Sequence, residues 1–271
     1  MMNNKRKILF FDVDGTLITE DGTRYFPESA RKALATARKN GNLVFINSGR
    51  VYCNITEDIK SAGFDGYVCG CGTSIIYDGR ELFHNEIDKK VCREIAEACR
   101  KYGMYGMFEH RDRVYIDGLN MDRPELLEMV EYFRDNNVYV GEDVRSEDFV
   151  FDKFCCWFDE KRSDVKAFKS FVSDSFDYID RGGEFCEIVP KGFSKATGIQ
   201  FLLDYFNIPL SDSYAFGDGY NDEPMLLYCP NSVIMDKGPD DLKEKVMLVT
   251  EDAEYDGIYN AMVKLGIIEP Q

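Results

Sequence analysis

Short apolar runs recur at both ends of the chain, and each is separated from the next by a segment of helical length. The runs lie at residues 8–11, 43–46, 67–69, 214–216 and 233–235. Brief runs of this kind are typical of strands that are buried on both faces. Because strands that alternate with helices predict a parallel sheet with crossover helices, we expect an α/β fold with a Rossmann-like core.

The middle of the chain follows another pattern, since its strand candidates arrive in pairs. These candidates lie at residues 113–117, 154–159, 178–180 and 185–189, with helices expected at residues 124–136 and 164–175 and a hairpin turn at residues 77–80. Paired strands favour an antiparallel or mixed sheet. We therefore expect a discontinuous core domain, residues 1–84 and 187–271, with a large α+β cap domain inserted at residues 85–186.

The charge balance argues against two classes of partner. The chain has 33 Lys and Arg residues against 49 Asp and Glu residues, a formal charge of −16. This surplus of negative charge disfavours nucleic acid and anionic membrane surfaces as partners. No apolar run approaches the ~18–20 residues of a membrane span, and the N-terminus lacks a signal-peptide pattern. The nine cysteines show no disulfide or metal spacing. We expect a reduced, cytoplasmic protein, and its oligomeric state stays open.

Two carboxylates follow the first predicted strand. Asp12 and Asp14 are two residues apart, so in an extended segment they point the same way. They lie at the carboxyl end of the strand, where open α/β sheets bind ligands. Converging carboxylates repel each other unless a cation joins them, and an all-oxygen site suits Mg²⁺. A plain acidic turn and the metal-binding D-x-D of a glycosyltransferase are the alternatives for this pair alone.

Three further segments carry polar residues at expected strand ends or helix starts. Ser48 follows the second apolar run and could bind a phosphate oxygen or cap a following helix. Lys195 lies in the first turn of a helix, where a cation opposes the helix dipole, so it serves an anion or a carboxylate cluster, or it is a solvated surface lysine. Asp218 and Asp222 follow a third apolar run and could cap a helix or complete a metal site.

Taken together, these segments resemble the four motifs of the haloacid dehalogenase superfamily of phosphotransferases. The motifs are Asp12-Val13-Asp14-Gly15-Thr16-Leu17, Ser48, Lys195 and Gly217-Asp218-Gly219-Tyr220-Asn221-Asp222. The resemblance covers essentially the whole chain, and the large insertion is similar to the cap of the Cof-type sugar-phosphatase subfamily. It extends to Ser48-Gly49-Arg50, to residues 187–195 and to Asp256-Gly257-Ile258.

The resemblance implies roles for the acidic residues. Asp12 would be the nucleophile that forms an aspartyl-phosphate, and Asp14 would be the general acid and base. Asp12, the backbone carbonyl of Asp14, and Asp218 would hold Mg²⁺, with Asp222 orienting these groups.

The resemblance also implies which residues meet the substrate. The phosphate would be bound by Ser48, Gly49, Lys195 and Asn221. Arg50, Cys71 and Glu187 would lie near the rest of the substrate.

Several residues depart from the family pattern or lie outside it. Cys71 stands where the subfamily usually has asparagine, and Met235-Asp236-Lys237-Gly238 replaces the usual Met-Gly-Asn-Ala. Both changes put the usual substrate range in doubt. His84 and His110 belong to no motif, so we expect ordinary surface or hinge residues. Cys69 and Cys71 have no partner pair, so we expect no metal there.

The leading functional hypothesis is a Mg²⁺-dependent phosphatase that hydrolyses small phosphorylated metabolites, sugar phosphates above all, with the cap selecting the substrate. A phosphomutase of the phosphomannomutase type is one alternative, because that branch shares the fold and all four motifs. The other is a non-catalytic phospho-acceptor or regulatory protein. Receiver domains of that kind are about half as long and place the phosphorylated aspartate after a later strand.

Overall fold

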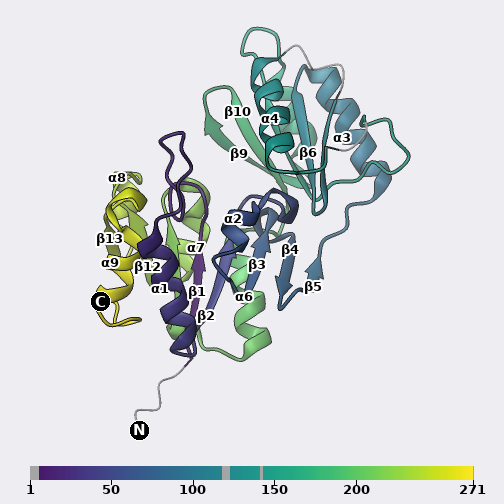
Figure 1. Cartoon of the computed structure of the whole chain (residues 1–271). Coiled ribbons are helices and arrows are strands. Elements are labelled where there is room, and N and C mark those ends of the chain that lie inside the picture. The colour runs from purple at the N-terminus through teal and green to yellow at the C-terminus, as the bar shows by residue number, and fades with distance from the viewer. Residues whose placement is uncertain (1–5, 118–122, 141–142, 271) are drawn as a thin grey trace. The chain divides into compact units, whose positions relative to one another are not determined.

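The structure is a computed structural model, and it describes residues 6–117, 123–140 and 143–270. The chain divides into two compact units (Figure 1). The core unit comprises Met1–Gly49, Glu57–Leu82 and Ser194–Gln271, and the inserted unit comprises Arg50–Thr56 and Phe83–Phe193. No helix in the described part of the chain has the length and apolar character needed to cross a membrane.

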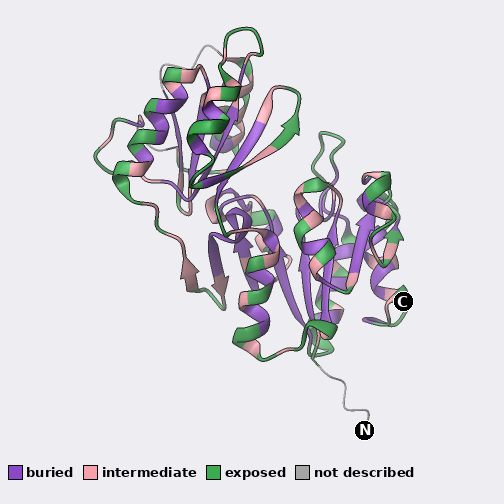
Figure 2. Ribbon diagram, turned by 180° about the vertical axis from the view of Figure 1, so that it is seen from behind, coloured by how far each residue is buried: buried purple, intermediate pink, exposed green. Residues whose placement is uncertain are grey.

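The core unit is built on an eight-stranded sheet of order β13-β12-β11-β1-β2-β3-β4-β5. Its parallel strands are β1 (Ile8–Phe11), β2 (Leu43–Asn47), β3 (Gly66–Cys69), β11 (Ser213–Gly217), β12 (Asn231–Met235) and β13 (Leu248–Thr250). Strand β4 (Ser74–Tyr77) runs antiparallel to β3 and continues into β5 (Arg80–His84). As expected for strands covered on both faces, every residue of β1 and β2 is buried (Figure 2). The predicted α/β core with a parallel sheet is confirmed.

Helices pack against this sheet in two pairs. Helix α1 (Glu28–Lys39) lies beside α9 (Gly257–Lys264), and α6 (Lys195–Phe206) lies beside α7 (Glu223–Tyr228). The short helices α2 (Glu57–Lys60) and α8 (Asp240–Lys243) complete the unit. The sequence of helix α1 explains why it forms: Ala30, Ala33, Leu34 and Ala37 recur at helical spacing and form its buried face.

The inserted unit has a five-stranded sheet of order β7-β6-β8-β10-β9, antiparallel at every pairing. The strands are β6 (Tyr105–His110), β7 (Arg113–Ile116), β8 (Lys153–Trp157), β9 (Phe176–Gly182) and β10 (Phe185–Pro190). The helices are α3 (Lys89–Tyr102), α4 (Pro124–Asp135) and α5 (Val165–Val172).

Side chains alternate between the two faces of this sheet, so its apolar residues form two separate clusters. Phe108 and Phe154 pair across β6 and β8 and join a cluster with residues of α3 and α5. Their neighbours Met107 and Cys155 join a second cluster with residues of α4. Because successive strand residues point to opposite faces, the sheet is covered by α3 and α5 on one face and by α4 on the other.

The division of the chain differs from the one expected from the sequence. We predicted a cap of residues 85–186, whereas the inserted unit runs from Phe83 to Phe193 and also contains Arg50–Thr56. Strand β10 continues to Pro190 because it pairs with β9 along its length. The segment Arg50–Thr56 belongs to this unit because the amide of Cys53 donates to the carbonyl of Arg111, at 3.0 Å.

The aromatic cluster of the inserted unit gives a stability prediction. Phe154 is fully buried, with ring centroids of Phe108 and Phe176 at 5.5 and 5.8 Å. Phe154→Ala should lower the free energy of unfolding by about 3–5 kcal/mol, because it removes a buried ring and leaves a cavity. The matched variant Phe171→Ala removes a ring that is 45% exposed, so it should cost less than about 1 kcal/mol. Urea unfolding followed by circular dichroism measures both, and equal losses would contradict this packing.

Candidate active site

Asp12 lies at the carboxyl end of β1, in the middle of the core sheet. Its amide donates to the carbonyl of Phe216 at 2.9 Å, which continues the pairing of β1 with β11 by one residue. The residue is 3% exposed. Its side chain therefore has a fixed position at the strand end, where the sequence placed it.

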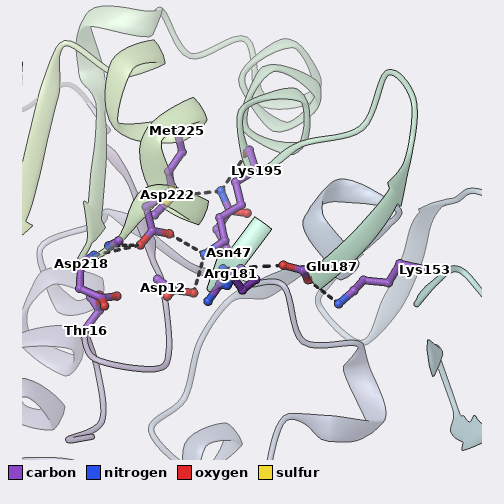
Figure 3. Close-up of polar contacts among 11 residues, drawn as sticks. Asp12, Thr16, Asn47, Lys153, Arg181, Glu187, Lys195, Asp218, Asp222 and Met225 are labelled. Carbon is purple, nitrogen blue, oxygen red and sulfur yellow. Dashed lines mark hydrogen bonds and ion pairs between the residues drawn. The ribbon is translucent and has the colours of Figure 1, made fainter. Parts of the chain in front are cut away.

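Lys195 brings two of the carboxylates together. Its Nζ lies 2.6 Å from Asp12 Oδ1 and 2.5 Å from Asp222 Oδ1, and the residue is 1% exposed (Figure 3). Ser194 caps helix α6 in a capping box with Thr197. The interpretation of Lys195 as a solvated surface lysine is therefore wrong, because the ammonium is buried between carboxylates.

Asn47 fixes the start of α6 from the neighbouring strand. Its Nδ2 donates to the carbonyl of Lys195 at 2.9 Å, so the end of β2 holds the backbone that carries the lysine (Figure 3). Asn47 belongs to none of the sequence motifs. A buried amide directly before Ser48 was the available signal, since a buried polar side chain requires a partner.

Asp222 is fully buried and uses both oxygens within the core unit. Oδ1 pairs with Lys195, and Oδ2 accepts from the amides of Asp218 and Gly219 at 2.9 and 3.2 Å. The carboxylate thus shapes the loop after β11 and positions Asp218, which fits the orienting role that the family resemblance implies.

Asp218 lies against the first motif. Thr16 Oγ1 donates to Asp218 Oδ1 at 3.1 Å (Figure 3). Gly15 has φ of +75°, and a Cβ there would lie 2.5 Å from Asp218 Oδ2. Glycine at this position therefore permits both the left-handed backbone and the close approach of the two motifs.

The carboxylates of Asp12, Asp218 and Asp222 offer oxygens that lie within 4.8 Å of one another, close enough to hold one metal ion. The Asp14 carboxylate is not part of this group, and Asp14 is partly exposed. The metal role expected of Asp14 is through its backbone carbonyl, and that role stays a prediction.

Electrostatics show what this group of carboxylates requires. Burial and the neighbouring Asp222 raise the pKa of Asp12 to about 7, and burial with Asp222 and Asp12 raises the pKa of Asp218 to about 9. Burial alone would lower the pKa of Lys195, but its ion pairs with Asp12 and Asp222 raise it above its ordinary value. One ammonium faces three carboxylates, so the site lacks positive charge. Oxygen donors with this deficit fit a hard divalent cation such as Mg²⁺.

Ser48 lies at the end of β2 and is 2% exposed. Its amide donates to the carbonyl of Val68, and its own carbonyl accepts from Cys71 at 3.1 Å. The alternative that Ser48 caps a following helix is wrong, because the next helical turn (Tyr52–Asn54) has Val51 at its cap and no side-chain cap bond. Gly49 directly follows Ser48 in the core unit. Asn221 lies in the turn Tyr220–Asp222, beside the carboxylates.

Cys71 adopts a left-handed conformation, with φ of +57°. Asparagine is enriched in this region and cysteine is not, which gives the subfamily's usual asparagine a backbone reason. The Cys71 side chain is buried.

The other two residues expected near the substrate belong to the inserted unit. Arg50 Nη1 donates to the carbonyl of Asn54 and to the hydroxyl of Tyr132, both at 3.0 Å. Glu187 pairs with Lys153 at 2.5 Å, and Lys153 pairs with Glu109 at 2.7 Å. Their proximity to a substrate stays a prediction.

The ion cluster around Lys153 was not anticipated. Lys153 and Glu109 pair across β8 and β6, and both are 3% exposed. Burial raises the pKa of Glu109, although Lys153 opposes this shift. The available signal in the sequence was one charged residue within each of these apolar strands, Lys153 in β8 and Glu109 in β6. Buried charges need partners, so such residues indicate an ion pair.

Comparisons with known proteins agree with this geometry. The sequence model of the haloacid dehalogenase-like hydrolases matches residues 9–262. The chain therefore belongs to this family.

Individual relatives cover the chain almost completely. The chain is 27% identical to "Putative phosphatase YkrA" of Bacillus subtilis, over 97% of this chain and 99% of that protein. It is 25% identical to the 5-amino-6-(5-phospho-D-ribitylamino)uracil phosphatase YitU of the same organism, over 95% of this chain and 96% of that protein. Such relatives support a phosphoric monoester hydrolase.

Solved structures of phosphatases also superpose on nearly the whole chain. The phosphatase BT1666 of Bacteroides thetaiotaomicron superposes with a TM-score of 0.81 and 25% identity, over 97% of this chain and 96% of that one. The subclass IIB sugar phosphatase BT4131 superposes with a TM-score of 0.80 and 25% identity, over 97% of this chain and all of that one. The match to Cof-type neighbours confirms the subfamily that the sequence resembled.

The contact between Gly15 and Asp218 can be tested with a matched pair of variants. Gly15→Ala would push the Asp218 carboxylate away, so hydrolysis of p-nitrophenyl phosphate should fall about tenfold or more. Gly22→Ala meets the same left-handed backbone, with φ of +85°, but no atom of the described residues lies within 4 Å of its Cβ. Gly22→Ala should therefore leave the rate nearly unchanged. Equal rates in the two variants would contradict the proposed role of the close approach.

Proposed function

We propose that this protein is a Mg²⁺-dependent phosphatase that hydrolyses small phosphorylated metabolites, with sugar phosphates as the substrate class, through an aspartyl-phosphate on Asp12. The observation that carries the proposal is the buried Asp12 carboxylate, which Lys195 holds at 2.6 Å beside Asp218 and Asp222. A carboxylate at a strand end, oriented by a buried ammonium and grouped with oxygen ligands, suits nucleophilic attack on a phosphoryl group.

Asp12 would supply the nucleophile of two successive displacements. A carboxylate oxygen attacks phosphorus and the bond to the alkoxide breaks, which gives an acyl phosphate. Water then attacks the same phosphorus, breaks the bond to Asp12 and releases inorganic phosphate. The carboxylate is regenerated, so the steps balance as hydrolysis.

Asp14 would manage the protons of both steps. It is partly exposed, whereas Asp12 is buried, and its charge raises the pKa of Asp12. A carboxyl group near the nucleophile that can reach solvent suits a general acid, which protonates the leaving alkoxide and then takes a proton from the attacking water.

Asp12, Asp218 and the backbone carbonyl of Asp14 would hold the cation, while Asp222 keeps Asp218 in place. When bound, Mg²⁺ supplies charge neutralisation for the phosphoryl oxygens. Lys195, Ser48, the amide of Gly49 and Asn221 would bind those oxygens in addition.

Two observations support sugar phosphates as the substrate class. BT4131, a sugar phosphatase, shares the fold over 97% of this chain. The inserted unit also provides charged side chains, buried on Arg50 and Glu187 and exposed on Arg181, of a kind that can bind hydroxyl groups. We propose that the inserted unit selects the leaving group while the core binds the phosphate.

Metal dependence is the first prediction of this proposal. Chelation should abolish hydrolysis, and Mg²⁺ should restore it, because the carboxylate group otherwise repels a phosphate. Asp218→Asn should raise the Mg²⁺ concentration for half-maximal rate about tenfold or more. Asp78→Asn is the control, because it lies in the β4–β5 turn with φ of +49°, which asparagine tolerates. Full activity in excess chelator would contradict the proposal.

Turnover of a sugar phosphate only after addition of a sugar bisphosphate would favour the phosphomutase.

Asp14 gives a second prediction, which depends on the leaving group. Asp14→Asn should slow hydrolysis of a sugar phosphate far more than hydrolysis of p-nitrophenyl phosphate, because p-nitrophenolate leaves without a proton. The measurement is kcat/KM for both substrates in both enzymes. An equal loss on the two substrates would show that Asp14 is not the acid.

A further inference from the structure

The only two histidines of the chain lie together in the inserted unit. His84 ends β5 and His110 ends β6, and their ring centroids are 5.9 Å apart at an interplanar angle of 79°. Asp152, directly before β8, completes the group. No motif of the sequence includes any of these residues, and the expectation that both histidines are ordinary surface or hinge residues does not explain their convergence.

The ligand atoms of the three side chains are close enough for one ion. His84 Nε2 lies 2.7 Å from Asp152 Oδ1, and one nitrogen or oxygen from each of the three residues lies within 4.8 Å of the others. His110 Nδ1 lies 2.6 Å from Asp112 Oδ1. A carboxylate at Nδ1 fixes the proton there and leaves Nε2 as the donor atom, which is the arrangement common around metal-bound histidines.

Asp152 supplies an independent observation that a ligand belongs here. Its side chain is 2% exposed, and its Oδ2 has no hydrogen-bond partner among the described residues. A buried carboxylate oxygen without a partner is costly. Its backbone amide donates to the carbonyl of Glu109 at 2.8 Å, so the residue is held beside His110 by the sheet.

A cavity adjoins the cluster and provides access. It has a volume of about 290 Å³ and is lined by all three residues together with Glu86, Lys89 and Arg111, among others. The side chains of His84 and His110 are 11% and 12% exposed, so an ion can reach them from this side.

We propose that His84, His110 and Asp152 form a binding site for a divalent transition-metal ion of the zinc type, with its remaining coordination position facing the cavity. Two imidazoles and one carboxylate are the donors of open zinc sites, which keep a position for water or a ligand. Mixed nitrogen and oxygen donors suit zinc-type ions, whereas the all-oxygen group at Asp12 suits Mg²⁺. The site is therefore chemically distinct from the proposed catalytic centre and does not depend on it.

Metal binding would change the contact between Arg111 and the ring of His84. Its Nη1 lies 3.3 Å from His84 Nδ1. Because a guanidinium only donates, Nδ1 accepts here and Nε2 carries its proton toward Asp152. A bound ion would replace that proton at Nε2, the proton would move to Nδ1, and Arg111 would turn away from the ring.

The test uses the full chain without a histidine tag, labelled with ¹⁵N and titrated with Zn²⁺. Since the chain has two histidines, every imidazole signal reports this cluster. We expect the ring resonances of both histidines to shift together and to saturate at about one ion per chain. Co²⁺ should give the visible absorption of a low-coordinate site with nitrogen ligands, which is a second measurement on the unmodified chain.

Variants separate this site from other acidic groups. His110→Gln and Asp152→Asn should weaken Zn²⁺ binding about tenfold or more, and Asp112→Asn by a smaller factor. Glu86→Gln, in the same cavity but outside the cluster, and Asp218→Asn, in the core unit, should leave the affinity within about twofold. A shift of one histidine alone, no shift at ~100 µM Zn²⁺, or equal affinity in Asp152→Asn would overturn the proposal and leave a hydrogen-bonded network only.

Discussion

The ion pairs of Lys195 are the interaction on which the rest of the core unit depends. A buried ammonium joins Asp12 at the end of β1 to Asp222 after β11, from the first turn of α6. Its removal would leave two buried carboxylates facing each other, a change that costs about 3–5 kcal/mol in comparable buried pairs. The same contact orients the carboxylate that we propose as the nucleophile. Structural and catalytic demands therefore meet at one side chain, in a position that opposes the helix dipole.

Much of this arrangement follows from the sequence because a parallel sheet brings the carboxyl ends of its strands to one edge. Asp12, Ser48 and Asp218 each follow an apolar run, so the runs predict their positions at strand ends, and the family resemblance predicts that they share one site. The partners of each side chain were not predictable. The two amides that bind Asp222 and the bond from Asn47 to the start of α6 depend on loop conformations that no pattern encodes.

The inserted unit was harder to predict from the sequence than the core unit. Strand β6 was missed, although it is an inner strand of its sheet, because Gly106 and Glu109 interrupt its apolar pattern. Gly106 is required there since a Cβ would lie 2.7 Å from the Phe108 ring, and Glu109 is buried because Lys153 pairs with it. Without β6, neither the Lys153 cluster nor the meeting of His84 with His110 could be inferred. These are tertiary contacts between segments far apart in the chain.

Trapping the intermediate tests the central claim most directly. The enzyme is mixed with a sugar phosphate and Mg²⁺, quenched in acid and treated with borohydride, which reduces an aspartyl-phosphate to homoserine. The peptides that contain residues 8–17 and residues 217–222 are then examined by mass spectrometry. The account predicts homoserine at Asp12 and not at Asp14, with none in Asp12→Asn. Homoserine at Asp14 or Asp218, or turnover without any reduced aspartate, would contradict it.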